Sequence, residues 1–470
     1  MTASAETIER LKQAAGPDGF SDDVSELKPH LTEWRGKYRG CTPLMLKPRT
    51  SAEIAAILSI CNETRTPVVP QGGNTGLVGA QIPLNGEILL YLGRMNGIRN
   101  IDVDDMTAIA EAGVVLGDFQ RAVSGSGAYF PLSLAAEGSA TLGGNLSTNA
   151  GGTNVLRYGS ARQLVLGVEV VLADGRVLDL LRVLHKDNTG YDLKQLFIGA
   201  EGTLGVITAA ALKLSPKPVT RETAFVAVRN ANAAVELLRL LQNETGGMIS
   251  AFELLPRIGL ELVLAHIPQT RDPLTTPSPW YVLVEAESPS AIPLRPIVEH
   301  ALSAALHSGL VTDATLASSE NQRAALWRLR ESMSEAQKLE GASIKHDISI
   351  PVRAIPAFLA QGIAAVEALI PEVRSVSFGH IGDGNIHFNL SAPKGAGDAQ
   401  FLSRWDEVSR VVHDITHGFG GSISAEHGIG VMKRDEIVRY KGATELDVMR
   451  TLKRTLDPNN ILNPGKVLQT

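Results

Sequence analysis

The sequence predicts an α+β protein of two or three domains, and three observations support that prediction. A chain of 470 residues is longer than one hydrophobic core usually holds. Residues 67–214 contain the patterns of short strands separated by glycine-rich turns, whereas residues 222–350 alternate strand and helix patterns. This alternation favours an antiparallel sheet that carries helices on one side. The proline-containing stretch 215–218 marks the expected boundary between the two patterns.

Composition and charge exclude several classes of protein. The formal net charge of −6 gives no general attraction to nucleic acid or to an anionic membrane. The sequence has no run of about 20 apolar residues, so we expect no membrane span. Residues 1–19 lack the apolar core of a secretory signal, which favours a cytoplasmic protein. Cys41 and Cys61 are too few for a disulfide framework, so we expect two reduced thiols.

The first half of the chain carries clear helix and strand signals. A helix is expected over 50–63, where Thr50 or Ser51 can cap the N-terminus and Glu53 follows. Apolar patterning predicts a second helix, several strands and a hairpin with an Asp-Gly turn. The helix lies at 115–125, the strands at 67–70, 88–92, 98–103, 107–112 and 206–214, and the hairpin at 164–180.

Two glycine-rich segments of this half suggest a phosphate-bearing cofactor. Residues 71–79 follow a short strand and expose backbone N–H groups, which form an anion nest suited to a pyrophosphate. Residues 138–152 are almost all small, or small amides and hydroxyls, as expected of a surface pressed against a flat polar cofactor. The sequence contains neither a G-x-G-x-x-G motif nor a P-loop motif, so the Rossmann and Walker routes to a nucleotide are not supported.

The second half alternates helices and strands. The helix expected over 321–339 would place Arg330 and Ser334 on one face, four residues apart, and the strand that follows carries Lys345. The strands are expected at 222–228, 247–254, 280–287, 342–350 and leading into 424–430, and the helices at 231–241, from about 256, at 294–308, 321–339, 356–369 and 399–417.

The stretch with the strongest chemical signal is a histidine hairpin. Residues 382–385 carry strong turn chemistry between two apolar runs, which predicts a hairpin loop. His380 would then face His387 across the strands, with Cβ atoms about 5 Å apart. Asn389 would share that face because side chains alternate along a strand. Two facing imidazoles indicate a metal site, and the alternative is a pair of structural histidines that close the end of a sheet.

A second acidic-histidine pair, Glu426 and His427, adds to the indication of a metal site. On a strand these adjacent side chains would diverge, so that one could bind a metal while the other faces another group. A site with histidine and carboxylate donors suits zinc first, with manganese and iron as alternatives. We interpret His413 and His417, four residues apart on a predicted helix, as surface or structural residues because this better donor set exists.

Taken together, these motifs resemble the flavin-dependent oxidoreductases of the vanillyl-alcohol oxidase/p-cresol methylhydroxylase superfamily. Within it they are most similar to the FAD-dependent D-2-hydroxyacid dehydrogenases, the group of D-2-hydroxyglutarate and D-lactate dehydrogenases. The resemblance runs from about residue 42 to residue 466. Four segments resemble the flavin-domain signatures and two resemble the metal and catalytic motifs: 71–76, 137–152, 186–194 and 201–207, and then 378–390 and 425–430.

The resemblance implies an α+β fold in three parts. A p-cresol methylhydroxylase-type FAD-binding domain would occupy residues 1–218, and a substrate domain with a large antiparallel sheet residues 219–430. A C-terminal helical segment, 431–470, would return to the FAD domain. Members with covalently bound flavin use a His or Cys near the pyrophosphate loop, and 68–71 offers neither. We therefore expect non-covalent FAD.

The resemblance also assigns candidate residues one by one. Expected ligands of a divalent metal are His380, His387 and Glu426, and His427 is the expected catalytic base. The expected substrate contacts are Arg330, Ser334, Lys345 and Asn389, with Ser334 at a position where threonine is typical of the family. The expected FAD contacts are Pro70, Gln71, Gly72, Gly73, Asn74, Thr75, Gly76, Leu77, Glu137, Gly138, Ser139, Thr141, Gly143, Gly144, Asn145, Thr148, Asn149, Gly151, Glu201, Gly202, Gly205, Val206, Ile207 and Asn463.

The implied reaction oxidises a D-2-hydroxy acid by removing a hydride from C2 and a proton from the hydroxyl. The flavin accepts the hydride at N5, and an imidazole such as that of His427 titrates in the range needed to take the proton. A divalent metal on the hydroxyl and α-carboxylate would lower the pKa of the hydroxyl. Arg330 and Lys345 together favour a dicarboxylate, so the expected reaction is D-2-hydroxyglutarate to 2-oxoglutarate.

Several alternatives stay open at this point. D-lactate or D-malate is the alternative substrate. Electrons would pass to an electron-transfer flavoprotein or a quinone, while an oxidase that uses oxygen is a further option. The chain could also be the flavoprotein subunit of a glycolate-type oxidase, or a redox-neutral transferase like alkyl-dihydroxyacetone-phosphate synthase, because fold does not fix function. A homodimer is the oligomeric state considered.

Overall fold

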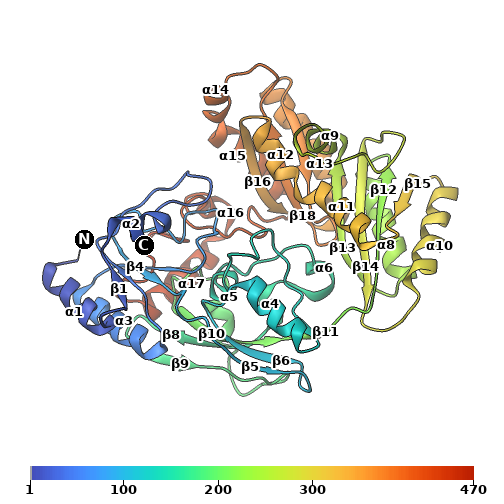
Figure 1. The fold of residues 1–470 in the computed structure, drawn as a ribbon. Coiled ribbons are helices and arrows are strands. Elements are labelled where there is room, and N and C mark those ends of the chain that lie inside the picture. The colour runs from blue at the N-terminus through green and yellow to red at the C-terminus, as the bar shows by residue number, and fades with distance from the viewer. Residues whose placement is uncertain (1–2, 470) are drawn as a thin grey trace. The chain divides into compact units, whose positions relative to one another are not determined.

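A computed structural model of the chain describes residues 3–469 (Figure 1) and divides them into two compact units. Unit 1 comprises the chain up to Ala150, Ser160–Lys217 and the chain from His427 onwards. Unit 2 comprises Gly151–Gly159 and Pro218–Glu426. The expected division into three domains at 218 and 430 stays a prediction.

The first sheet of unit 1 has four strands in the order β1-β2-β4-β3, of which β2, β4 and β3 run parallel. Helix α3 packs its Ile54, Ile57 and Leu58 onto this sheet beside Leu11 of α1. Thr50 caps α3 by accepting the N–H of Glu53, as the sequence predicts. The elements are α1 (Ala5–Ala15), β1 (Phe20–Ser21), β2 (Met45–Leu46), α3 (Ser51–Thr64), β3 (Val68–Gln71) and β4 (Ile88–Tyr91).

The second sheet of unit 1 is entirely antiparallel, with five strands in the order β5-β6-β10-β8-β9. Its strands agree with the predicted ones, including the Asp-Gly hairpin. A short helix, α5, lies within the run of small residues, where none was predicted; Thr141 caps it by accepting the N–H of Gly144. The elements are β5 (Ile98–Asp102), β6 (Thr107–Glu111), α4 (Leu116–Gly125), α5 (Leu142–Thr148), β8 (Val165–Val171), β9 (Val177–Asp179) and β10 (Val206–Lys213).

The C-terminal segment belongs to unit 1, where Figure 1 draws α16 and α17 in red among the blue N-terminal elements. Leu462 forms a parallel bridge with Val68 of β3, and Lys453 donates to the carbonyl of Thr203. These contacts hold the segment around Lys453 and Leu462 against the rest of unit 1. The helices are α16 (Ile437–Tyr440) and α17 (Ala443–Leu456).

Unit 2 contains a four-stranded antiparallel sheet in the order β13-β14-β12-β15, which has helices on both faces. Along β12, Ala224 and Val226 face a core that includes α8 and α10. Phe225 and Ala227 face a core that includes α9, α11 (Glu320–Glu331) and α12 (Met333–Leu339). The expectation of helices on one side is therefore wrong, because both side-chain sets of β12 are apolar. The elements are β12 (Thr220–Val228), α8 (Ala231–Glu244), β13 (Ile249–Pro256), α9 (Arg257–His266), β14 (Trp280–Ser288), α10 (Leu294–His307) and β15 (Val311–Leu316).

A second, three-stranded antiparallel sheet completes unit 2 in the order β16-β18-β17. One of its faces, with Ile344 and Phe388, packs on helices α13 and α15. The opposite face carries the polar residues described below. The elements are β16 (Ser343–Ser349), α13 (Ile355–Leu369), β17 (Arg374–Phe378), β18 (Asn385–Ser391) and α15 (Trp405–Gly418).

Three predicted elements of unit 2 differ in the structure. The helix expected over 321–339 is two helices, α11 (Glu320–Glu331) and α12 (Met333–Leu339), separated at Ser332. The helix expected over 399–417 likewise divides into α14 (Asp398–Leu402) and α15. Residues 424–430 form a loop instead of following a strand, and Ser422 forms an isolated bridge with Ser349 of β16.

Among the described residues, one helical segment, Val352–Leu369, is long and apolar enough to cross a membrane. A single such helix is weak support for a span, since a helix on the core of a soluble protein meets the same criteria. Ile355, Phe358 and Val366 of this segment are buried in the core, whereas Gln361 and Glu367 are exposed. The expectation that the chain has no membrane span stays a prediction.

Candidate active site

The histidine hairpin of unit 2 has a different register from the predicted one. His387 of β18 lies opposite Phe378 of β17, and His380 belongs to the wider connection that follows β17. The predicted pairing of His380 with His387 is therefore wrong. The reason is that Gly379 exchanges both backbone hydrogen bonds with Leu254 of β13 (2.8 and 3.1 Å), so the chain turns toward that strand before it can close a tight loop.

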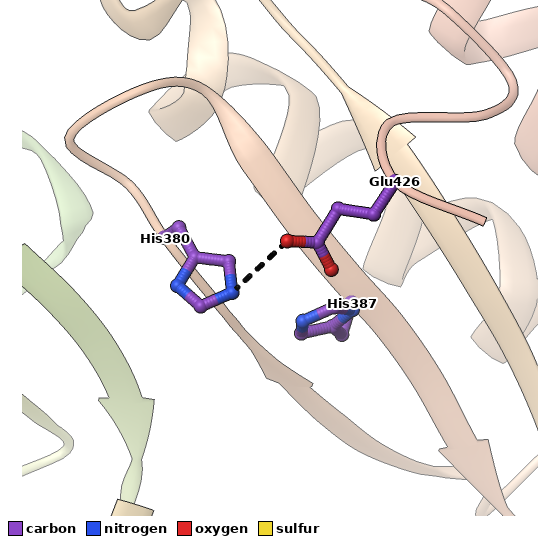
Figure 2. A group of neighbouring side chains, drawn as sticks. All are labelled: His380, His387 and Glu426. Atoms are coloured by element: carbon purple, nitrogen blue, oxygen red, sulfur yellow. Dashed lines mark ion pairs between the residues drawn. The ribbon is translucent and has the colours of Figure 1, made fainter. Parts of the chain in front are cut away.

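The two imidazoles nevertheless converge, with ring centroids 5.5 Å apart. Nitrogen and oxygen atoms of His380, His387 and Glu426 all lie within 4.8 Å of one another, and His380 Nε2 is 3.5 Å from Glu426 Oε1. Figure 2 shows the three side chains turned toward one another. Two imidazoles and a carboxylate at this separation form a donor set that fits a divalent cation such as zinc.

Glu426 is held in place by contacts within unit 2. Its backbone N–H donates to Asp347 Oδ2 at 2.9 Å, and its Oε1 accepts the N–H of Gly152 at 2.8 Å. The expected FAD contact Gly151 lies beside this carboxylate, because a Cβ at Gly151 would be 3.2 Å from Glu426 Oε1. Asp347, which the sequence motifs did not indicate, therefore positions an expected metal ligand.

Glu253 of β13 is a second functional candidate that sequence reasoning missed. It is fully buried; one oxygen accepts from His380 Nδ1 at 2.6 Å and the other from Arg330 Nε at 2.7 Å. Burial would raise the pKa of Glu253, but the charges of His380 and Arg330 outweigh it and lower the pKa to about 2. Burial lowers the pKa of His380, whereas Glu253 and Glu426 raise it, to about 9. A cation bound at Nε2 would compete with that proton.

The expected substrate contacts lie around the polar face of the three-stranded sheet. Lys345 pairs with Asn389, and Asp347 pairs with His387, so these four side chains share one face. Alternation along β16 and β18 explains this, since the intervening residues face the hydrophobic core. The structure therefore brings the expected metal ligand of β18 and two expected substrate contacts onto one surface.

Each expected substrate contact also has a partner in unit 2. The guanidinium carbon of Arg330 lies 4.7 Å from the centre of the Phe378 ring. Lys345 Nζ donates to the carbonyl of Ser334 at 3.3 Å, and Asn389 Nδ2 donates to Gln337 Oε1 at 3.2 Å. Arg330 and Ser334 do not share one continuous helix, since Ser332 separates α11 from α12.

In unit 1 the structure brings together glycine-rich segments that are distant in sequence. A Cβ at Gly72 would be 2.2 Å from Thr141 Oγ1, and one at Gly73 would be 1.9 Å from the carbonyl oxygen of Ser139. A Cβ at Gly202 would be 2.9 Å from Pro70 Cγ. Three of the expected FAD segments are thus in contact. Glycine is required at 72 and 73, because a side chain there would prevent the close approach of the two backbone segments.

Several expected FAD contacts use their side chains for structure. Gln71 hydrogen-bonds His30 and the carbonyl of Gln81, and Asn74 donates to the carbonyls of Pro29 and Thr32. The Asn149 oxygen accepts from Ser160 and Arg162. The side chains of Val206 and Ile207 are buried. These residues could contact a cofactor only through their backbones or remaining polar atoms.

Two amides of unit 1 fit a polar cofactor. Asn145 Nδ2 and Asn463 Oδ1 are buried polar atoms with no hydrogen-bond partner among residues 3–469, although Asn463 Nδ2 donates to the carbonyl of Glu201 at 2.8 Å. Buried polar atoms are normally satisfied, so such atoms indicate a missing partner. Together with the N–H groups of the 71–76 segment, they fit a dinucleotide with many polar groups.

Glu201 connects this region to the segment that follows the expected base. Its carboxylate accepts the N–H groups of Ile429 and Gly430 at 2.7 and 2.9 Å. Burial raises the pKa of Glu201 to about 7 despite these two hydrogen bonds. His427 directly follows Glu426 in the chain and begins the last segment of unit 1. Both residues lie in a loop, so the expectation that they diverge along a strand is wrong.

Comparison with known proteins assigns the chain to a family. A family model described as FAD linked oxidases, C-terminal domain, matches residues 217–467, and one described as FAD binding domain matches residues 42–181. The chain is 39% identical to a mitochondrial D-2-hydroxyglutarate dehydrogenase of Arabidopsis thaliana, over 98% of this chain and 81% of that protein. It is 35% identical to a D-2-hydroxyglutarate dehydrogenase of Stutzerimonas stutzeri, over 98% of both.

Solved structures show the same fold. A p-cresol methylhydroxylase with bound substrate aligns with a TM-score of 0.77 at 18% identity, covering 98% of this chain and 96% of that one. An alkyldihydroxyacetonephosphate synthase aligns with a TM-score of 0.72 at 17% identity, covering 98% and 85%. The chain therefore belongs to the FAD-linked oxidases: it is an FAD-linked oxidoreductase with a p-cresol methylhydroxylase-type fold. The resemblance drawn from the motifs is confirmed.

Proposed function

We propose that this protein oxidises a D-2-hydroxy acid with the help of a divalent metal, and that its substrate is D-2-hydroxyglutarate. The observation that carries the proposal is the grouping of His380, His387 and Glu426 beside the polar sheet face with Lys345 and Asn389. Relatives named D-2-hydroxyglutarate dehydrogenase, at 34–41% identity over nearly the whole chain, support this choice of substrate.

In this proposal each residue has a defined task. The bound FAD supplies a hydride acceptor. His427 takes the proton of the C2 hydroxyl, as neutral imidazole can do near pH 7. His380, His387 and Glu426 hold a divalent metal, zinc first and manganese or iron as alternatives, which supplies Lewis-acid polarisation of the hydroxyl. Asn389 and the Ser334 hydroxyl add hydrogen bonds that orient the substrate.

The choice of a dicarboxylate depends on the two cations. Lys345 offers a point charge to a substrate carboxylate. Arg330 can bind a carboxylate through its terminal nitrogens, because its bond to Glu253 uses Nε. Because Glu253 already offsets part of the positive charge of Arg330, a monocarboxylate such as D-lactate is the second candidate, with D-malate between the two. The 17% identity to the synthase concerns the fold alone, so the transferase alternative receives no support from it.

Further features belong to the same proposal. We infer that FAD is bound non-covalently, since Val68, Val69, Pro70 and Gln71 offer no attachment side chain. Electrons would pass to an electron-transfer flavoprotein or a quinone. The relatives from Arabidopsis and cattle carry the word mitochondrial in their names and the bacterial ones do not, so a cytoplasmic location stays a prediction, as does a homodimer.

The decisive experiment is dye-linked turnover by the purified protein, before and after EDTA, with the D- and L-forms of 2-hydroxyglutarate, lactate and malate. Strong turnover with D-2-hydroxyglutarate that EDTA abolishes and zinc restores is the expected result. Turnover mainly with D-lactate would be consistent with the proposed mechanism but would show that the substrate is not a dicarboxylate. Full activity of a protein from which EDTA has removed all metal would show that the reaction needs no metal. If no substrate reduces the dye, the flavoprotein subunit of a glycolate-type oxidase or the redox-neutral transferase is favoured.

A further inference from the structure

Glu253 occupies a central position that no sequence motif indicates. It lies on β13, is fully buried, and contacts one expected metal ligand and one expected substrate contact. We propose that Glu253 is a positioning residue that couples the metal site to the substrate-carboxylate site through a single carboxylate. The inference rests on the proposed function, because it assumes that His380 binds a metal and that Arg330 binds a carboxylate of the 2-hydroxy acid.

The two oxygens of Glu253 have separate tasks. Oε1 accepts from His380 Nδ1 at 2.6 Å, and Oε2 accepts from Arg330 Nε at 2.7 Å. With Nδ1 used as a donor, Nε2 is the remaining ring nitrogen, and it is the one 3.5 Å from Glu426. A carboxylate behind a histidine sets the tautomer and the ring orientation that metal binding requires.

The same carboxylate limits the freedom of Arg330. The guanidinium is held at Nε by Glu253 and lies 4.7 Å from the centre of the Phe378 ring, so two contacts fix its plane. Among the described residues Arg330 makes its hydrogen bond through Nε, so its two terminal nitrogens can bind an external carboxylate. A movement of Glu253 would therefore disturb the metal ligand and the carboxylate anchor together.

The fold explains how Glu253 reaches both partners. Gly379 is bound to Leu254, the residue after Glu253, by two backbone hydrogen bonds. This bridge brings His380 next to Glu253, although β13 and β17 belong to different sheets. An apolar side chain would fill a core position without the desolvation cost of a carboxylate. What Glu253 adds is the orientation of His380 and Arg330.

Glu285 of the neighbouring strand β14 provides a matched control. It is also buried and accepts from Arg323 Nε at 2.7 Å, from Trp327 Nε1 at 2.9 Å and from Thr223 Oγ1 at 2.7 Å. None of these partners is an expected metal ligand or substrate contact. Replacing Glu285 by glutamine thus reproduces the loss of a buried carboxylate in the same unit without touching the proposed site.

The test compares Glu253→Gln with Glu285→Gln in the purified FAD-loaded protein. Glutamine keeps the size of the side chain but presents an NH₂ group to either His380 Nδ1 or Arg330 Nε, so one of these two hydrogen bonds is lost. We expect the zinc affinity of Glu253→Gln, measured against a chromophoric chelator, to fall about 10- to 100-fold. KM for D-2-hydroxyglutarate should rise, while FAD content and melting temperature match those of Glu285→Gln. The control should keep the zinc affinity and KM of the unchanged protein.

The outcomes separate this inference from the proposed function. Suppose the unchanged protein binds zinc and oxidises D-2-hydroxyglutarate. If Glu253→Gln then has the same zinc affinity and KM, the inference is overturned and the proposed function stands. An unchanged protein that binds no zinc overturns both. If Glu253→Gln does not fold, the double variant Glu253→Gln/Arg330→Met removes the unpaired buried cation. That variant should again show the 10- to 100-fold loss of zinc affinity, and retained affinity would overturn the inference.

Discussion

The two units build their sites by different means. Unit 1 offers glycines, backbone N–H groups and the buried amides of Asn145 and Asn463, and the expected cofactor segments contact one another through positions where a Cβ would clash. Unit 2 offers charged side chains placed by strand alternation and held by the buried carboxylates Glu253 and Asp347. In unit 1, substitutions that add atoms should therefore impair cofactor binding. In unit 2, substitutions that remove or neutralise a charged side chain should impair metal and substrate binding.

The largest effect should come from removing a ligand in unit 2. His380→Ala deletes one of three expected metal donors, so activity should fall by at least about 100-fold, the upper end of what outer-shell changes cost. Zinc content should fall with it, while FAD content stays unchanged because all the expected FAD contacts except Gly151 lie in unit 1. His307→Ala, at an exposed position of α10, is the control and should change neither quantity. Full activity of a zinc-free His380→Ala protein would show that the ligand assignment is wrong.

The reverse pattern should follow from adding one carbon in unit 1. Gly73→Ala would place a Cβ 1.9 Å from a backbone oxygen of Ser139, so the loop must shift and FAD binding should be lost or strongly weakened. Flavin absorbance per protein measures this. Gly125→Ala is the control, because a Cβ there meets no atom of residues 3–469 within 4 Å. A Gly73→Ala protein with full FAD occupancy would remove the contrast between the units.

A smaller and more selective effect should come from Lys345→Met, which keeps the stem and removes the charge. A lost hydrogen bond to a charged group costs about 1.5–3 kcal/mol, so kcat/KM for D-2-hydroxyglutarate should fall about 10- to 100-fold. If Lys345 binds the distal carboxylate, D-lactate turnover should change far less. Equal losses for both acids would place Lys345 at the α-carboxylate instead. Lys394→Met, at an exposed loop position, controls for the loss of one positive charge.

The last effect is on stability rather than on activity, and its dependence on pH has opposite signs in the two units. Burial raises the pKa of Glu201 in unit 1 from 4.5 to about 7, a shift worth roughly 3 kcal/mol at most. Its stabilisation is fully present below about pH 4.5 and is lost as the pH rises through about 7. Glu253 in unit 2, with its pKa lowered to about 2, contributes stability above about pH 4.5 that is lost as the pH falls toward 2.

Thermal unfolding at pH 5 and pH 8 tests the Glu201 contribution. Glutamine resembles the protonated acid, so Glu201→Gln should lose less stability between these two pH values than the unchanged protein does. Parallel curves for the two proteins would show that Glu201 does not titrate in this range.

Local structure was largely determined by the sequence alone. Short-range sterics and hydrogen bonds decide local features, so these were predictable. Examples are the cap at Thr50, the Asp-Gly hairpin and the turns in the glycine-rich segments. The candidate metal ligands could be proposed because the donor types are rare and grouped in short motifs. Helix breaks such as that at Ser332 were not predictable, since no proline or glycine marks that position.

The tertiary structure alone decided how these pieces meet. The bridge between Gly379 and Leu254 sets the register of the histidine hairpin and puts Glu253 behind His380. Both contacts join residues far apart in the chain, so their geometry depends on packing that no local pattern encodes. For the same reason Glu253 looked like any other strand residue in the sequence. Burial between His380 and Arg330, which only the folded chain creates, is what makes it a functional candidate.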